Sequence, residues 1–175
     1  VSVPGVTDRH VYAQTHSALK GKDVPMVFQT YAEVEFLKAE AAIRGWISSS
    51  AEEHYNKGVT AAMKMLKQLY PASTAITDAE ISAYLAGPGA YDASKGWEMA
   101  MNEYWKATFL NEYEAYANWR RTGYPTLTPT KHPNSVSNNQ IFRRMIYPGG
   151  ESATNGDNYA AAVARQGADD FTTRM

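Results

Sequence analysis

Two neighbouring stretches of the chain carry the hydrophobic spacing of α-helices. In the first, Thr30 is followed three residues later by Glu33, which is the capping-box spacing that starts a helix. This predicts a helix from Tyr31 to about Arg44, where Gly45 can adopt the left-handed conformation that ends it. Apolar side chains point from this helix in two directions, so we expect neighbours on two of its faces.

The second stretch repeats the start signal at Ser50 and Glu53 and reaches a stop at Pro71. Its apolar residues recur at helical intervals: Tyr55, Val59, Ala62, Met63, Leu66 and Leu69. We expect this segment, up to Leu69, to form an antiparallel hairpin with the first helix. The predicted contacts are made by Leu37, Ala41, Tyr55 and Val59. The small and aromatic spacing resembles half of a tetratricopeptide unit, with one residue too many between Gly45 and Ala51.

A third capping box, Thr77 with Glu80, predicts a short helix to Leu85. Apolar and aromatic residues then recur at helical intervals from about Ala93 to Arg121, which predicts one long helix. We expect that helix to cover the second face of the first helix, which includes Phe36 and Ile43.

The two ends of the chain lack such periodicity. Residues 1–29 mix Pro, Gly and polar residues without a helical or strand period, so we expect an irregular lead-in there. Residues 125–175 are rich in Pro, Asn, Ser and Gly, with one short possible strand at 139–147 and a helix near 158–166. The predicted fold is all-α, with tetratricopeptide-like helical hairpins and a long helix in residues 30–124, followed by a loop-rich carboxy-terminal tail.

Composition and charge exclude several classes of function. The 175 residues are 44% hydrophobic, enough for one folded domain, and the net charge of −1 gives no reason to expect a nucleic-acid partner. No apolar run is long enough to span a membrane. There are no cysteines, and the four histidines lack metal-site spacing, so we predict no metal and no cofactor. An Asx-rich turn explains residues 155–158 better than calcium does.

The sequence also lacks the patterns of an enzyme. A glycosidase needs two carboxyl groups on opposite sides of a cleft, and the adjacent pair Asp169 and Asp170 does not meet that requirement by position alone. No nucleophile elbow or phosphate-binding glycine loop is present. We therefore predict a protein that binds its ligand without changing it.

Aromatic residues are the more informative group, because 12% of the chain is Phe, Trp or Tyr and flat rings pack well on sugar faces. Most follow helical stripes, which indicates packing. Tyr91, Tyr124 and Tyr147 lie beside Gly or Pro breaks, and Trp46 follows a helix stop. These four are the candidate ligand-binding residues.

Three segments together resemble the SusD/RagB family, in particular its branch of starch-binding proteins associated with the outer membrane. They read YAEVEFLKAEAA at 31–42 followed by RGW, then EAYANWRRTGYP at 114–125, and RRMIYP at 143–148 followed by Glu151, Asn155, Asn158 and Tyr159. The order and distances of the segments agree with the family pattern. Family members are much longer, so we expect this chain to be the carboxy-terminal part of such a protein, with a further family segment after Met175.

The resemblance implies a mainly helical, tetratricopeptide-based surface lipoprotein of Bacteroidota. Such a protein caps a SusC-like TonB-dependent transporter in the outer membrane and hands it oligosaccharides or peptides. Its only membrane contact would be a lipid anchor outside this chain. The alternative that stays open is a tetratricopeptide-like adaptor that binds another protein or a peptide.

Four charged residues of the resembling segments are expected to be structural: Glu40, Glu114, Arg120 and Arg121. The two arginines occupy the last turn of a predicted helix, where the helix dipole favours positive charge. At least one guanidinium is expected to reach carbonyl groups of the tail, or the carboxylate of Glu40 or Glu114, and so clamp the tail onto the helices.

Overall fold

The computed structural model describes residues 15–129 and 131–173, which divide into two compact units, Val1–Ala115 and Tyr116–Met175. Within these described residues the chain forms helices and no strands, which confirms the all-α prediction. The strand predicted at 139–147 is wrong, because no extended neighbour supplies a ladder of hydrogen bonds for it. The part of the lead-in before residue 15 lies outside the described residues.

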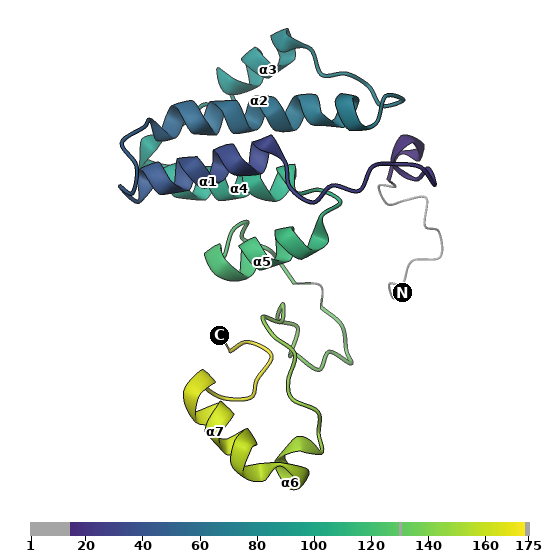
Figure 1. Cartoon of the computed structure of the whole chain (residues 1–175), viewed down its shortest axis with the longest axis vertical. Helices are drawn as coiled ribbons and strands as arrows, with labels where there is room; N and C mark the ends of the chain where they lie inside the picture. The colour runs from purple at the N-terminus through teal and green to yellow at the C-terminus, as the bar shows by residue number, and fades with distance from the viewer. Residues whose placement is uncertain (1–14, 130, 174–175) are drawn as a thin grey trace. The chain divides into compact units, whose positions relative to one another are not determined.

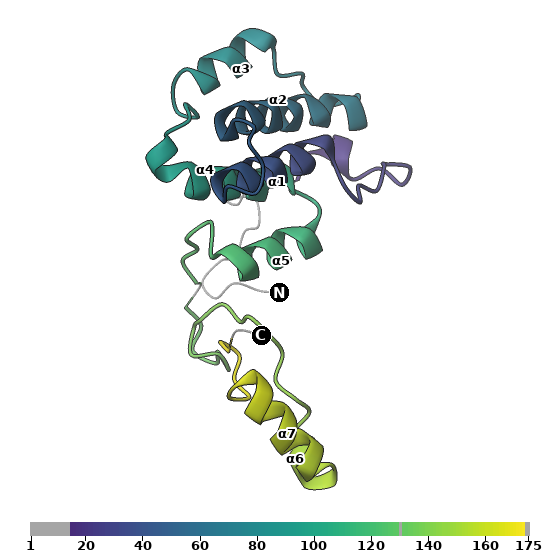
Figure 2. The same ribbon diagram turned by 60° about the vertical axis from the view of Figure 1, so that its left-hand side comes forward.

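The first unit is built on the hairpin of α1 (Tyr31–Ile43) and α2 (Ala51–Leu69), which lie side by side in both views (Figures 1 and 2). The short connection between them makes the pair antiparallel, as the sequence predicts. The fold of this unit is therefore tetratricopeptide-like. Gly45 has a φ of 72°, the left-handed conformation predicted for the end of the first helix.

The helix starts follow the predicted capping chemistry. Thr30 Oγ1 accepts from the amide of Glu33, and the Glu33 carboxylate accepts from the amide of Thr30 at 3.0 Å. The same reciprocal pair starts α3 (Asp78–Leu85) at Thr77. At Ser50 only half of the box forms, because the Glu53 carboxylate pairs with Lys57 instead.

The buried face of α1 differs from the predicted one. Ala32, Phe36 and Ala39 are fully buried, whereas Leu37 is 40% exposed. Tyr55 and Val59 of α2 are buried as predicted. Three glutamates of α1 are also buried: Glu33, Glu35 and Glu40.

The long helix predicted from Ala93 to Arg121 is two helices, α4 (Gly96–Ala107) and α5 (Glu112–Thr122). Thr108 Oγ1 bonds back to the carbonyls of the last turn of α4, and Leu110 has a φ of 72°. A non-glycine residue in that conformation cannot continue a helix.

Helix α4 packs on α1, as predicted for the segment through Trp105. The rings of Phe36 and Tyr104 lie 6.4 Å apart between centroids, and both are buried. Ile43, expected on the same face, is 37% exposed because it lies at the last turn of α1.

The second unit contains the end of α5 and the helices α6 (Glu151–Thr154) and α7 (Gly156–Gln166), the last close to its predicted place (Figure 1). Two short 3₁₀ turns, η2 (Ser17–Leu19) and η3 (Ala93–Lys95), lie in the first unit. None of the helices described is both long and apolar enough to cross a bilayer.

Candidate functional site

An exposed indole stands at the turn between α1 and α2. Trp46 is 69% exposed, directly after the left-handed Gly45. The guanidinium carbon of Arg44 lies 5.1 Å from the centre of its ring and 4.6 Å from the ring centre of Trp97. Arg44 is held in turn by Glu40, whose Oε1 accepts from Nε at 2.9 Å.

This arrangement fixes an aromatic surface that faces solvent. The Glu40 carboxylate is 5% exposed, so the charge pair behind the rings is shielded from solvent on one side. Cation–π contacts of this kind are worth about 0.5–1 kcal/mol at exposed sites, enough to restrict the indole without burying it. A rigid exposed ring can stack on a sugar or another flat apolar ligand.

Tyr91, a second predicted ligand residue, is packed instead. Its ring lies 5.3 Å from that of Tyr55, and its hydroxyl lies over Gly96, where a Cβ would come within 2.2 Å of the oxygen. Burial, with the negative charges of Glu52 and Asp92, raises its pKa. These contacts indicate a structural role for Tyr91, although its edge remains partly exposed.

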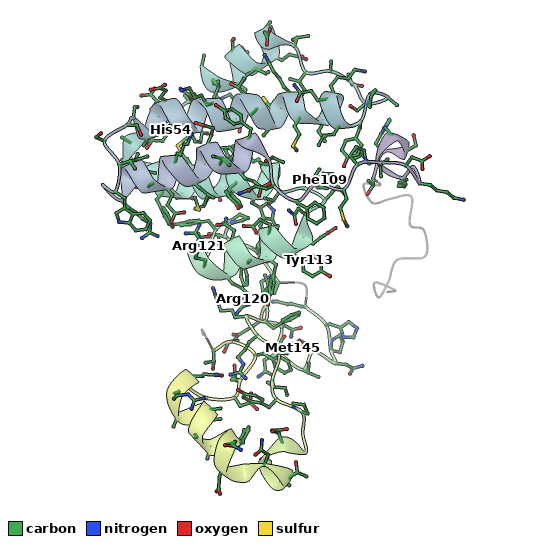
Figure 3. The ribbon with its side chains drawn as sticks, in the orientation of Figure 1. His54, Phe109, Tyr113, Arg120, Arg121 and Met145 are labelled. Atoms are coloured by element: carbon green, nitrogen blue, oxygen red, sulfur yellow. The ribbon has the colours of Figure 1, made fainter. Side chains whose placement is uncertain are left out.

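The second unit holds a pocket of about 450 Å³ that includes the predicted residue Tyr147. Its lining residues are Tyr116, Arg120, Phe142, Arg143, Arg144, Met145, Ile146, Tyr147, Pro148 and Gln166. Figure 3 labels Arg120 and Met145 from this lining. The Tyr147 hydroxyl donates to Gln166 Oε1 at 3.2 Å, which fixes the ring at the edge of the pocket. The size suits one or two sugar rings.

Asp169 is the shared hydrogen-bond acceptor of two residues that line the pocket, Arg144 and Tyr147. Its carboxylate accepts from Arg144 Nη2 at 3.1 Å, from the amide of Tyr147 at 3.1 Å and from the hydroxyl of Tyr159 at 3.3 Å. Its neighbour Asp170 accepts instead from Thr172, so the two carboxylates have separate partners. The pairing of Asp169 with Arg144 is a long-range contact that the sequence analysis missed, since no local pattern marks it.

Tyr124 lies in the same unit but is not among the residues that line the pocket. Its amide donates to Thr122 Oγ1 at 3.2 Å, and the bond to Pro125 is cis. Its ring is half-buried. Of the four predicted ligand residues, the structure places Trp46 on an exposed surface and Tyr147 in a pocket.

The predicted structural residues each have a defined contact. Glu114 Oε1 accepts from the buried hydroxyl of Tyr104 at 2.6 Å. Arg121 Nη2 donates to Asn118 Oδ1 at 2.8 Å, and Arg120 lies over the ring of Tyr116. The hydrogen bond between the tail and the end of α5 has its donor on the tail: Arg143 Nη1 donates to the carbonyl of Arg120 at 2.9 Å.

A structural role for Arg121 therefore stays a prediction that a single substitution can test. Arg121→Lys keeps the charge but loses the planar fork, so we expect a decrease in stability of about 0.5–1 kcal/mol. Thermal unfolding should show it, with ligand affinity unchanged. Loss of binding at an unchanged melting temperature would contradict it.

A contact chain of three side chains also joins the hairpin. Glu35 Oε2 lies 2.6 Å from His54 Nδ1, and His54 Nε2 lies 2.8 Å from Ser49 Oγ (Figure 3 labels His54). The order resembles a nucleophile, base and acid, but Ser49 lines none of the pockets described here. We interpret the chain as a link between the two helices and their turn. Within the described part of the protein, no three acidic or histidine side chains converge as metal ligands would.

A mixed-charge groove of about 580 Å³ runs beside α2. Its lining includes Tyr31, Glu53, Lys57, Lys64 and Gln68. Such a groove along helices is the feature that the adaptor alternative requires.

Comparison with known proteins gives one consistent answer. The sequence pattern of the family described as starch-binding, associating with outer membrane, matches residues 3–148. No functionally curated protein matches the chain significantly. A solved chitin-binding protein is 36% identical with a TM-score of 0.77, over 91% of this chain and 35% of its own.

Two further solved structures agree. A protein described as Bacteroidetes AC2a SusD-like is 34% identical with a TM-score of 0.80, covering 91% of this chain and 32% of its own. A SusD homologue from Bacteroides fragilis is 32% identical with a TM-score of 0.67, covering 83% of this chain and 34% of its own. The chain spans about a third of the length of these relatives. With the three resembling segments and the helical fold, these matches show that the chain belongs to the SusD-like family of starch-binding proteins associated with the outer membrane.

Proposed function

We propose that the protein binds oligosaccharide nutrients at the cell surface and passes them to a SusC-like TonB-dependent transporter. Family membership supports carbohydrate as the class of ligand and the outer membrane as the location. The chitin-binding relative supports a glycan ligand. The proposal includes a lipid anchor outside this chain and no chemical change of the ligand.

The observation that carries the proposal is the exposed indole of Trp46, held in place by Arg44. An exposed ring that is already held in one orientation loses less conformational entropy when it stacks on a sugar. The Glu40 carboxylate that holds Arg44 belongs to the same family segment as the turn.

Trp46→Ala is expected to weaken the binding of maltooligosaccharides or chitooligosaccharides about tenfold, which corresponds to about 1.4 kcal/mol. Isothermal calorimetry on the protein gives the affinity. The matched control is Tyr113→Ala, because Tyr113 is 90% exposed and no guanidinium of the described residues lies over its ring. Figure 3 labels Tyr113. Equal affinity in both variants would show that Trp46 does not bind the sugar. If the protein does not change its ligand, the sugars should be recovered intact after incubation with it.

The groove beside α2 favours one second candidate, an adaptor that binds an extended peptide. Lys57→Glu with Lys64→Glu would weaken peptide binding in that case and leave glycan binding unchanged.

A further inference from the structure

The pocket of the second unit has a lining of one charge type. Three of its residues are arginines, and none of the lining residues that the structure describes is acidic. Neutral sugars are recognised by hydrogen bonds that need both donors and acceptors, whereas guanidinium groups only donate. A lining of this kind favours a ligand that carries negative charge.

The second observation is that the buried guanidinium of Arg144 is only partly hydrogen-bonded. The residue is only 6% exposed, Nε donates to the carbonyl of Met145 at 3.1 Å, and Nη2 donates to Asp169 at 3.1 Å. Nη1 is buried and has no hydrogen-bond partner among the described residues. A buried charged donor without an acceptor is costly, so the fold retains a group that an oxygen acceptor would satisfy.

Aromatic rings hold the guanidinium groups in place. The guanidinium carbon of Arg144 lies 5.0 Å from the ring centre of Tyr147, and that of Arg120 lies 5.6 Å from the ring centre of Tyr116. The rings of Tyr116 and Phe142 lie 6.0 Å apart. The pocket thus combines fixed cationic forks with apolar ring faces, which suit the two sides of an acidic sugar.

We propose that this pocket binds the carboxylate of an acidic sugar, such as a uronic acid residue of an oligosaccharide. A carboxylate accepts a stronger, charge-assisted hydrogen bond from a guanidinium than a neutral hydroxyl does, and Nη1 is the one nitrogen of the Arg144 guanidinium that Met145 and Asp169 leave for it. The inference rests on the proposed glycan-binding function and names its substrate class. The pocket belongs to the second unit, whereas Trp46 belongs to the first.

The test compares trigalacturonic acid with its methyl ester, in which the carboxyl groups carry no charge. We expect the acid to bind at least ten times more tightly than the ester at low salt, with an affinity that falls as sodium chloride rises. Arg120→Gln should weaken acid binding at least fivefold, because Arg120 lines the pocket. Arg165→Gln, an exposed arginine of α7 outside the lining, should leave the affinity within twofold.

Arg144→Lys is a second variant, used only if circular dichroism shows that its fold is intact. The comparison of acid and ester on the unmodified protein does not depend on this variant. Equal affinity for acid and ester would overturn the inference, as would an unchanged affinity in Arg120→Gln. Binding of maltooligosaccharides or chitooligosaccharides without any binding of the acid would overturn this inference and leave the proposed function standing. Absence of binding to every glycan would overturn both.

Discussion

Replacing Gly58 by alanine is expected to destabilise the protein by roughly 2 kcal/mol, although alanine is the better helix former by about 1 kcal/mol. Gly58 lies in α2, where an added Cβ would come within 2.7 Å of one ring carbon of Phe36 and within 2.9 Å of two more. Phe36 is 0% exposed, with the rings of Tyr55 and Tyr104 beside it, so its ring cannot move aside. Urea unfolding followed by circular dichroism measures the loss.

A matched control exists at Gly156, the first residue of α7, where nothing lies within 4 Å of an added Cβ. Gly156→Ala should leave the stability unchanged or raise it slightly. Phe36→Leu in the Gly58→Ala background should recover part of the loss, since a smaller side chain makes room. Equal stabilities of Gly58→Ala and the unmodified protein would show that the α1–α2 contact is looser than the structure has it.

Local signals in the sequence predict the first hairpin well, because its helix ends depend on neighbouring residues only. Thr30 and Thr77 form their capping boxes, and Gly45 ends α1. The break between α4 and α5 was missed because residues 108–111 contain no Gly or Pro. One signal could have found it: Asn111 precedes Glu114 with the spacing of a helix start, and Asn111 Oδ1 accepts from the amide of Glu114.

Side-chain burial in α1 could not be predicted from hydrophobicity. Glu33 is 3% exposed and Leu37 is 40% exposed, the reverse of their ordinary preference. Burial raises the pKa of Glu33 against the lowering effect of its hydrogen bonds to Thr30, and the charge of Glu114 raises it further. Glu114 lies far from Glu33 in the sequence, so a single-residue scale cannot anticipate its effect.

The candidate site divides in the same way. Trp46 could be predicted as an exposed ring because it follows a local helix stop. The pocket around Tyr147 could not, since it needs α5, residues 142–148 and Gln166 to meet in space. Tyr91 lies in a loop near Gly89, as its position in the sequence suggested, and the packing of its ring against Tyr55 needed the fold.

Glu35 is a buried carboxylate whose pairing contributes to stability. Its side chain is 2% exposed, and burial acts to raise its pKa, but hydrogen bonds from His54 and Lys38 and the charge of Lys38 outweigh that effect. The net result lowers the pKa from 4.5 to about 2. The depressed pKa means that the pairing stabilises the folded state fully above the unfolded value of 4.5, and that this contribution is lost as the pH falls toward 2.

His54→Ala is therefore expected to reduce the free energy of unfolding by about 2–3 kcal/mol at pH 7, because it removes a charged hydrogen bond of 2.6 Å and leaves the buried Glu35 carboxylate with one partner fewer. The difference from the unmodified protein should shrink as the pH is lowered from 4.5 toward 2, where Glu35 gains its proton in both proteins. Urea unfolding at a series of pH values measures this. Ser49→Ala removes only the exposed end of the contact chain and should cost below about 0.5 kcal/mol. A loss in Ser49→Ala as large as in His54→Ala, or a His54→Ala difference that stays constant with pH, would show that Glu35 is not the group that His54 stabilises.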